Sequence, residues 1–324
     1  MSARRRVVLL VALAAAAAVA VVAAAIVSSD GESATPTVEE AAGPREGRPP
    51  LSLALGFRTD AEARDLSRAT GLYEKGRTAE AGALFARHDS LEAKVGAALA
   101  SWPRGSLDRL AQLGKLYPEE AVVQLNLGLA RLWANRGDPV AAWRAAAEAE
   151  PDTPYAILAG NVLYPKLPRG LPAFIPSFGA APEVTRLPPA RQLDALRVRA
   201  ERGRVRDGLL YGVGLQRVGR SVSARAAFEK AARGAPADAE AQVAAAVGAF
   251  DKADPAIAFG RLGPLTRRFP HEPSVRFHLG VLLLWTGRID DAERQLRLAS
   301  RTRPGSPLAK EATRYLETIR KARS

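Results

Sequence analysis

The chain has 324 residues, a net charge of +13 and a hydrophobic share of 47%. It contains no cysteine, which excludes disulfides, thiolate nucleophiles and cysteine metal sites. Of its 47 basic residues, 39 are arginine, which indicates either a solvated basic surface or attraction to an anionic polymer or lipid. Basic residues form no contiguous run beyond Arg4–Arg6. The solvated surface is therefore the favoured interpretation, and nucleic acid is not expected as a partner.

Residues 1–27 are predicted to be a signal anchor, that is, a single transmembrane helix. The stretch from residue 7 to residue 27 is apolar without interruption and long enough to cross a hydrocarbon core of about 30 Å. Arg4–Arg6 before it favours a cytoplasmic N-terminus and an extracytoplasmic remainder. The alternatives are a signal peptide cleaved near Ala23–Ala25, which would release a secreted protein, and a buried soluble helix.

Residues 28–57 are predicted to be a disordered linker, because the stretch up to Pro50 is poor in large hydrophobic residues and rich in Ser, Thr, Glu, Gly and Pro. Residues 58–164 are predicted to form irregular helical hairpins. Apolar residues recur there at helical spacing between turn signals. The expected helices are 61–73, 78–88, 91–101, 107–117, 120–134, 139–148 and 154–164.

Residues 165–189 are a proline-rich insertion. Seven prolines in 25 residues exclude a continuous helix, because each internal proline removes a hydrogen bond and clashes with the preceding turn. The segment nevertheless carries Leu171, Phe174, Ile175 and Phe178. An ordered extended segment packed against the helices is the favoured prediction. A mobile lid or partner-binding loop and plain disorder are the alternatives.

The strongest signal is a pattern that recurs every 34 residues between residues 205 and 304, within the predicted repeat region 190–304. Small residues occupy two phases, a large apolar residue a third, and a proline closes each copy. The members are Gly212, Ala246 and Gly280; Ala224, Ala258 and Ala292; Phe228, Leu262 and Leu296; and Pro236, Pro270 and Pro304. Small residues at a helix crossing let two helices approach closely, so each copy is expected to be a helical hairpin that needs its neighbours. Residues 305–324 are predicted to be a capping helix.

This pattern resembles the tetratricopeptide repeat family, most closely over Val205–Pro304 and more weakly over residues 61–151. The large aromatic residue that the family carries early in the first helix is replaced by Gly208, Gln242 and Arg276. The resemblance implies an all-α, right-handed helical-hairpin solenoid and a bacterial, membrane-anchored member of the family.

The resemblance also implies a concave surface, lined by the first helix of each copy, that binds a protein or peptide partner. Its expected lining is Leu209, Val213, Gln216, Arg217, Val243, Val247, Phe250, Asp251, Phe277, Val281, Leu284 and Trp285. Trp285 is expected to be exposed. Two alternatives stay open: Phe250, Phe277 and Leu284 belong to the core, or residues 165–189 fill the groove. The Lys/Asn set with which some members of the family clamp a terminal carboxylate is missing.

The sequence gives no positive support for an enzyme. His88, His271 and His278 show neither metal-ligand spacing nor a carboxylate pattern, and nucleophile-elbow and phosphate-loop motifs are missing. No cofactor is expected. The predicted function is a membrane-tethered scaffold for protein–protein interaction on the extracytoplasmic side. The alternatives are a binder of anionic polymer or lipid, and an envelope-assembly factor whose 165–189 loop contacts a larger complex.

Overall fold

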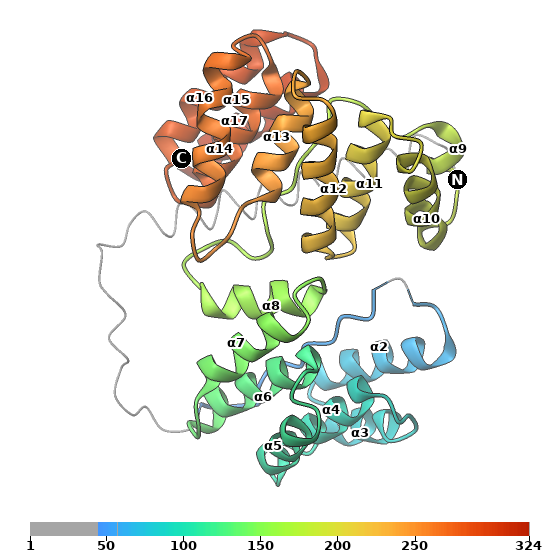
Figure 1. The fold of residues 1–324 in the computed structure, drawn as a ribbon. Helices are drawn as coiled ribbons and strands as arrows, with labels where there is room; N and C mark the ends of the chain where they lie inside the picture. Colours follow the sequence, from blue (N-terminus) through green and yellow to red (C-terminus); the bar gives the residue numbers. More distant parts are fainter. Residues whose placement is uncertain (1–44, 57, 324) are drawn as a thin grey trace. The chain divides into compact units, whose positions relative to one another are not determined.

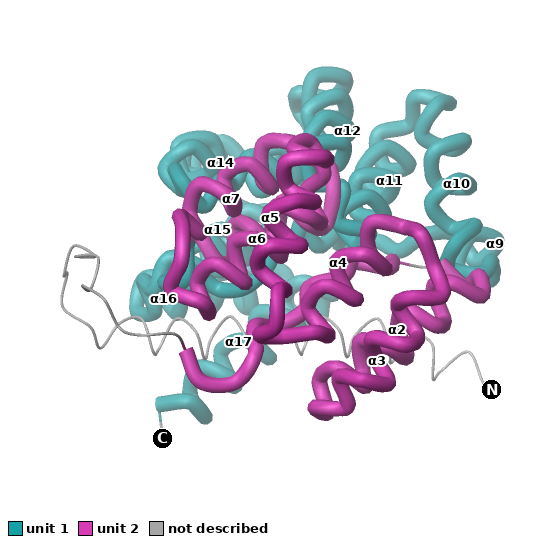
Figure 2. Tube along the Cα trace, turned by 90° about the horizontal axis from the view of Figure 1, so that it is seen from below, with its two compact units in different colours: residues 1–34, 164–324 teal, residues 35–163 magenta. Residues whose placement is uncertain are grey.

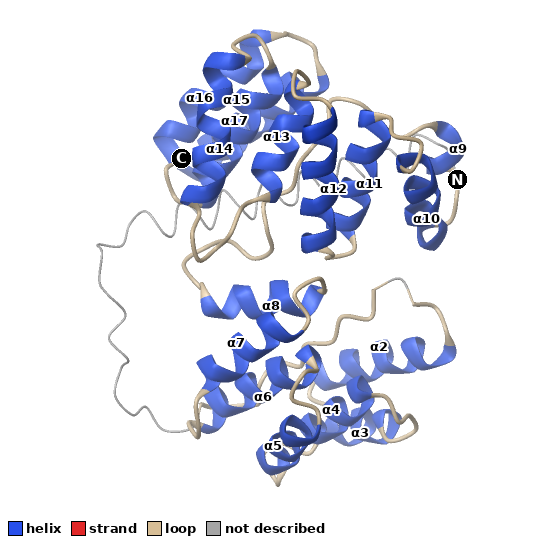
Figure 3. Cartoon of the chain, in the orientation of Figure 1, coloured by secondary structure: helices blue, strands red, loops and turns tan. Residues whose placement is uncertain are grey.

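The computed structural model describes residues 45–56 and 58–323 (Figure 1). Within these residues the chain forms sixteen helices and no strand (Figure 3), which confirms the prediction of an all-α protein. None of the helices described combines the length and the hydropathy that a membrane span requires. The anchor predicted at residues 7–27 and most of the predicted linker lie outside the described residues.

The chain divides into two compact units (Figure 2), each with its own hydrophobic core. The described residues of unit 2 are 45–56 and 58–163, and those of unit 1 are 164–323. Each unit consists of an extended segment followed by helices. We call residues 45–56 the N-terminal strap and residues 165–181 the inner strap.

Unit 2 contains three helical hairpins and one further helix, as the sequence pattern predicted. Side chains of Asp60, Ser90 and Asp138 accept backbone hydrogen bonds at helix starts, which satisfies donors that the helix itself leaves unpaired. The helices are α2 (Ala61–Glu74), α3 (Thr78–Phe85), α4 (Leu91–Ala100), α5 (Ser106–Leu116), α6 (Ala121–Ala134), α7 (Pro139–Ala149) and α8 (Pro154–Leu163).

Unit 1 begins with the inner strap and two helices and continues with the three regular repeats. Gly219 and Gly287, with φ of 76° and 75°, make the left-handed turns within the first and third hairpins. The helices are α9 (Pro182–Thr185), α10 (Pro189–Ala200), α11 (Val205–Arg217), α12 (Ser221–Gly234), α13 (Ala239–Gly248), α14 (Ala256–Arg268), α15 (Pro273–Trp285), α16 (Ile289–Thr302) and α17 (Pro307–Arg323). α17 occupies the place of the predicted capping helix.

The repeat phases mark places where two helices of one hairpin touch. A Cβ added to Gly212 in α11 would lie 2.3 Å from the ring of Phe228 in α12, and one added to Gly280 in α15 would lie 2.8 Å from Cγ of Leu296 in α16. Only glycine leaves room for these large side chains. The large residues therefore fill the helix crossing directly.

The prediction of a disordered linker over residues 28–57 is wrong for the N-terminal strap. Residues 45–56 are an ordered extended segment, because Leu51, Leu53 and Leu55 pack against the core of unit 2 and Pro49 is buried. These apolar residues supply buried area that favours an ordered segment.

Candidate functional site

The backbone of the inner strap is held by side chains from three successive first helices. The Phe174 N–H donates to Oε1 of Gln216 in α11 at 3.2 Å, and the Ile175 N–H donates to Nε2 of His278 in α15 at 2.9 Å. The Ser177 N–H donates to Oε1 of Glu240 in α13 at 3.0 Å. Each first helix thus presents one side-chain acceptor to the backbone of this extended segment.

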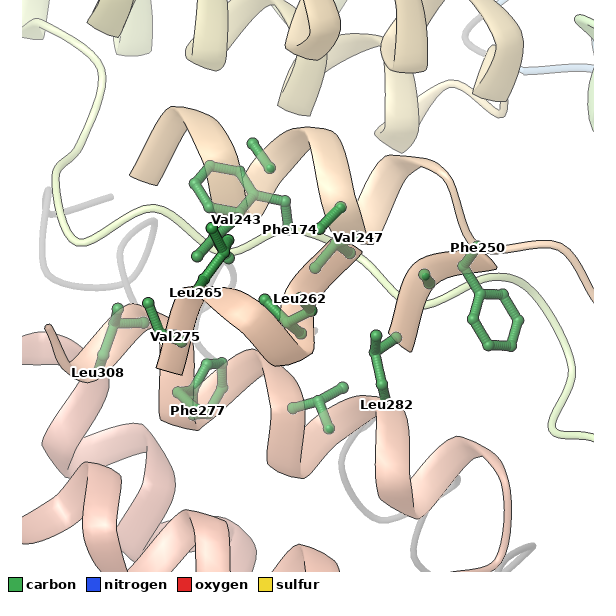
Figure 4. Close-up of a cluster of buried hydrophobic side chains, with 14 of the residues drawn as sticks. Phe174, Val243, Val247, Phe250, Leu262, Leu265, Val275, Phe277, Leu282 and Leu308 are labelled. Carbon is green, nitrogen blue, oxygen red and sulfur yellow. The ribbon is translucent and has the colours of Figure 1, made fainter. Parts of the chain in front are cut away.

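Phe174 anchors the strap in the core of unit 1 (Figure 4). Its side chain is 1% exposed. The ring meets Phe228 edge-to-face with 5.6 Å between centroids and stacks on His278 at 5.1 Å, which are favourable aromatic geometries. Leu171 and Ile175 pack beside it. The strap therefore fills the space between the first helices instead of leaving an open groove there.

The start of the strap is fixed near the C-terminal ends of α13 and α15. Nζ of Lys252 donates to the Pro168 carbonyl at 2.8 Å and lies 6.0 Å from the centroid of the Trp285 ring. Burial lowers the pKa of Lys252 to about 8. At the other end, the Arg206 guanidinium lies 5.0 Å from the Phe178 centroid, close to the start of α11. The strap therefore runs antiparallel to the first helices.

Burial favours the neutral forms of two titratable groove residues, His278 and Glu240. Nε2 of His278 must accept the Ile175 hydrogen bond, so Nδ1 carries the proton and donates to the Ser274 carbonyl at 2.7 Å. Burial lowers the pKa of His278 to about 4 and raises the pKa of Glu240. Oε2 of Glu240 is buried and has no hydrogen-bond partner among the described residues.

The structure places the residues predicted to line a concave surface mostly inside the core. Leu209, Val213, Val243, Val247, Phe250, Phe277, Val281 and Leu284 are all buried. Gln216 is the member of the predicted set that binds the strap backbone, while Arg217 and Asp251 are exposed. These positions border the strap-filled groove; they do not form an empty one.

Trp285 is not exposed, contrary to the prediction. Its side chain is 5% exposed and meets Phe250 edge-to-face at 5.9 Å. Gly170 of the strap lies beside the ring, since a Cβ added there would be 4.0 Å from Cη2. Helical spacing alone does not show that the strap covers this position, which is why the sequence pointed to solvent.

Sequence reasoning missed Glu240, Lys252 and His278 as site residues. One signal could have found Glu240: it shares a repeat phase with Arg206 and Ser274, polar residues in the first turn of a first helix. All three contact the strap or His278. His278 and Lys252 occur once each in their phases, so no repeat pattern identifies them.

Unit 2 holds its N-terminal strap in a similar way. Asn126 of α6 accepts the Ser52 N–H and donates to the Ser52 carbonyl, both at 2.9 Å. The Tyr155 hydroxyl of α8 accepts the Ala54 N–H at 3.1 Å. Asn126 is fully buried, and burial raises the pKa of Tyr155 to about 12. Holding an extended segment through first-helix side chains is therefore a property of both units.

Residues 45–56 and 58–323 contain no group of three or more His, Cys, Asp or Glu side chains that could hold a metal ion. The fold and the site define a class: an all-α protein of paired helices whose inner surface holds extended chain. No family model matches the sequence, and no curated protein matches it.

Among solved structures, the crystal structure of yeast Tom70 is similar to this chain with a TM-score of 0.37 and 12% identity. The match covers 86% of this chain and 53% of Tom70, so the chain spans about half the length of that neighbour. A match this distant adds nothing to what the helix pairs themselves show.

Proposed function

We propose that the protein is a non-catalytic helical-repeat scaffold that binds other proteins. One observation carries the proposal: Gln216, Glu240 and His278 on three successive first helices hold the backbone of an extended segment. Because these bonds go to backbone N–H groups, they can be made with any chain that adopts the same extended form.

The proposal includes a place in the cell. The apolar stretch at residues 7–27 would tether the protein to a membrane, and Arg4–Arg6 before it favours an extracytoplasmic solenoid. This part rests on the sequence alone. Protease accessibility of the solenoid in intact cells, combined with N-terminal sequencing, tests it. A mature chain that begins after Ala25 would instead support a secreted protein.

Protein binding is tested by photo-crosslinking of the full chain in its native membrane. A photoreactive amino acid is placed at Arg217 or Asp251, which are exposed and adjoin in sequence Gln216 and Lys252, two residues that contact the strap. Matched controls carry it at Val222 or Leu298, which are 49% and 46% exposed on second helices. We expect a discrete protein adduct from Arg217 and Asp251 only. Equal adducts at all four positions, or none, would contradict a binding surface there.

The structure adds no observation that favours the anionic-polymer alternative. Several arginines are paired with carboxylates, such as Arg225 and Arg261 with Glu229, and Arg288 with Asp291. Surface pairs of this kind reduce the charge available to an anionic polymer. A titration of acidic vesicles against salt separates the two functions, since polymer binding would fall steeply with ionic strength.

Deletion of the 165–189 loop is not a clean test of the envelope-assembly alternative. Deleting residues 165–189 would remove α9 and the buried side chains of Phe174 and Val184, so it would lower the stability of unit 1 as well as remove the loop. Loss of association after such a deletion would therefore report unfolding as much as a lost contact.

A further inference from the structure

The inner strap makes its contacts as a bound peptide does. Between residues 171 and 180 the described chain makes no backbone–backbone hydrogen bond. The backbone donors at 174, 175 and 177 go instead to groove side chains. The segment can therefore leave its place without breaking a helix.

The strap also alternates as an extended ligand does. Pro172 and Phe174 are buried, while Ala173, Ser177 and Gly179 are exposed. The groove thus selects particular side chains and leaves their neighbours in solvent.

We propose that the inner strap is an internal pseudo-ligand, and that the groove it fills binds an extended, phenylalanine- and proline-containing segment of a partner protein. This inference rests on the proposed protein-binding function and adds the chemistry of the partner and the means of its regulation.

The contacts define which sequences fit the groove. A phenylalanine is required at the position of Phe174, because its site is formed by the rings of Phe228 and His278. The positions of Phe174, Ile175 and Ser177 must each carry an N–H group, which excludes proline there. Proline is accepted two residues before the phenylalanine and two residues after it, as at Pro172 and Pro176, and it favours the extended form.

Attachment of the strap makes it a strong competitor. A tethered segment acts at an effective concentration in the millimolar range. The affinity that a partner segment shows is therefore reduced by the small fraction of molecules in which the groove is open. Weakening the strap, and not the groove, should raise the affinity for a segment added from outside.

The test uses the full chain and a fluorescent synthetic peptide with the sequence of residues 168–180. Phe174→Ala removes the anchor of the strap and leaves the groove side chains in place. Ile175→Pro removes the N–H that His278 accepts. Ala173→Ser, at an exposed strap position, is the matched control. We expect the first two variants to bind the peptide at least about tenfold more tightly than the wild type and the control.

Specificity is read with three altered peptides. A peptide with alanine at the position of Phe174, or with proline at that of Ile175, should not bind the open variants more tightly than the wild type. A peptide with alanine at the position of Pro176 should keep most of the gain in affinity. If both open variants keep their helicity and neither gains affinity, the strap is a structural element and the proposal is wrong. The proposal would also be overturned if all three altered peptides showed the same gain in affinity as the original peptide.

Two further measurements cover other outcomes. If both variants unfold, hydrogen exchange of the wild type decides: amides 174, 175 and 177 exchanging before the helices supports a removable strap, and exchange only on global unfolding refutes it. Concentration-dependent wild-type dimers with exchanged straps would overturn the assignment to a partner protein, because the groove would then bind a second copy of this chain. Failure of the peptide assay, with crosslinks at Arg217 and Asp251 retained, removes the pseudo-ligand but leaves the scaffold.

Discussion

The backbone N–H of Ile175 donates a 2.9 Å hydrogen bond to Nε2 of His278, although 103 residues separate the two in the chain. The imidazole can accept this bond only in its neutral form. It is 1% exposed, and burial lowers its pKa to about 4. The inner strap is therefore held by a histidine that stays neutral throughout the physiological pH range.

Stability should fall as the pH falls from 6.5 to 4. In this window the unfolded chain protonates His278, whereas the folded chain does not, so the unfolded state binds more protons and is stabilised relative to the folded state. A pKa lowered from 6.5 to about 4 corresponds to a loss of about 3 kcal/mol at roughly 1.4 kcal/mol per pH unit. Urea unfolding at several pH values measures this loss.

His278→Gln is the control, because glutamine offers an acceptor and does not titrate. Its free energy of unfolding should decline less than that of the wild type between pH 6.5 and 4. Glu240, whose pKa burial raises, works in the opposite direction, but it is present in both proteins and its contribution cancels in the difference. Parallel pH profiles would show that His278 is not the responsible group.

Two glycine substitutions in unit 1 should have opposite effects. Gly212→Ala places a Cβ 2.3 Å from the Phe228 ring, and overpacking of this kind costs about 1–3 kcal/mol. Gly260→Ala in α14 meets nothing within 4 Å and should stabilise the helix by up to about 1 kcal/mol. Chemical denaturation of both variants measures the contrast. A Gly212→Ala protein as stable as the wild type would refute the close approach of α11 and α12.

The repeat arrangement could be predicted because it is periodic. The spacing of 34 residues between Gly212, Ala246 and Gly280 locates helix pairs and the residues at their crossings. Approximate helix ends in residues 58–164 followed from turn signals between the apolar stretches. These features depend on residues close in sequence, and pattern reading captures such residues well.

The inner strap was predicted in part, as an ordered extended segment packed against the helices. Its individual contacts could not be predicted, because they are long-range and occur once. Proline content excluded a continuous helix over residues 165–189, but nothing in the sequence pairs Ile175 with His278. The N-terminal strap did carry a local signal. Leu51, Leu53 and Leu55 alternate with smaller residues, which is typical of an extended segment with one buried side, and the polar composition before them obscured it.

Two substitutions in unit 2 should loosen the N-terminal strap to different extents. Asn126→Ala removes both hydrogen bonds to Ser52 and should cost about 1–3 kcal/mol, because buried partners are left unsatisfied. Tyr155→Phe removes only the acceptor for the Ala54 N–H. Hydrogen exchange should speed up at both amides in the first variant and mainly at Ala54 in the second. Unchanged exchange at Ser52 in Asn126→Ala would mean that other contacts hold the strap.

The last prediction concerns Phe250 and Trp285, which meet edge-to-face at 5.9 Å. Both are nearly buried, so each alanine substitution should lower the free energy of unfolding by about 3–5 kcal/mol. The double variant should lose less than the sum, by about 0.5–1.5 kcal/mol, because the aromatic contact is lost only once.

Leu298→Ala serves as the exposed control for this cycle, since Leu298 is 46% exposed and its loss should change stability by no more than about 0.5 kcal/mol. The measurement is chemical denaturation followed by circular dichroism. A Trp285→Ala protein as stable as this control would show that Trp285 is exposed and not buried. Partner capture by Trp285→Ala could then be read as binding, whereas for a buried Trp285 any loss of capture must first be corrected for unfolding.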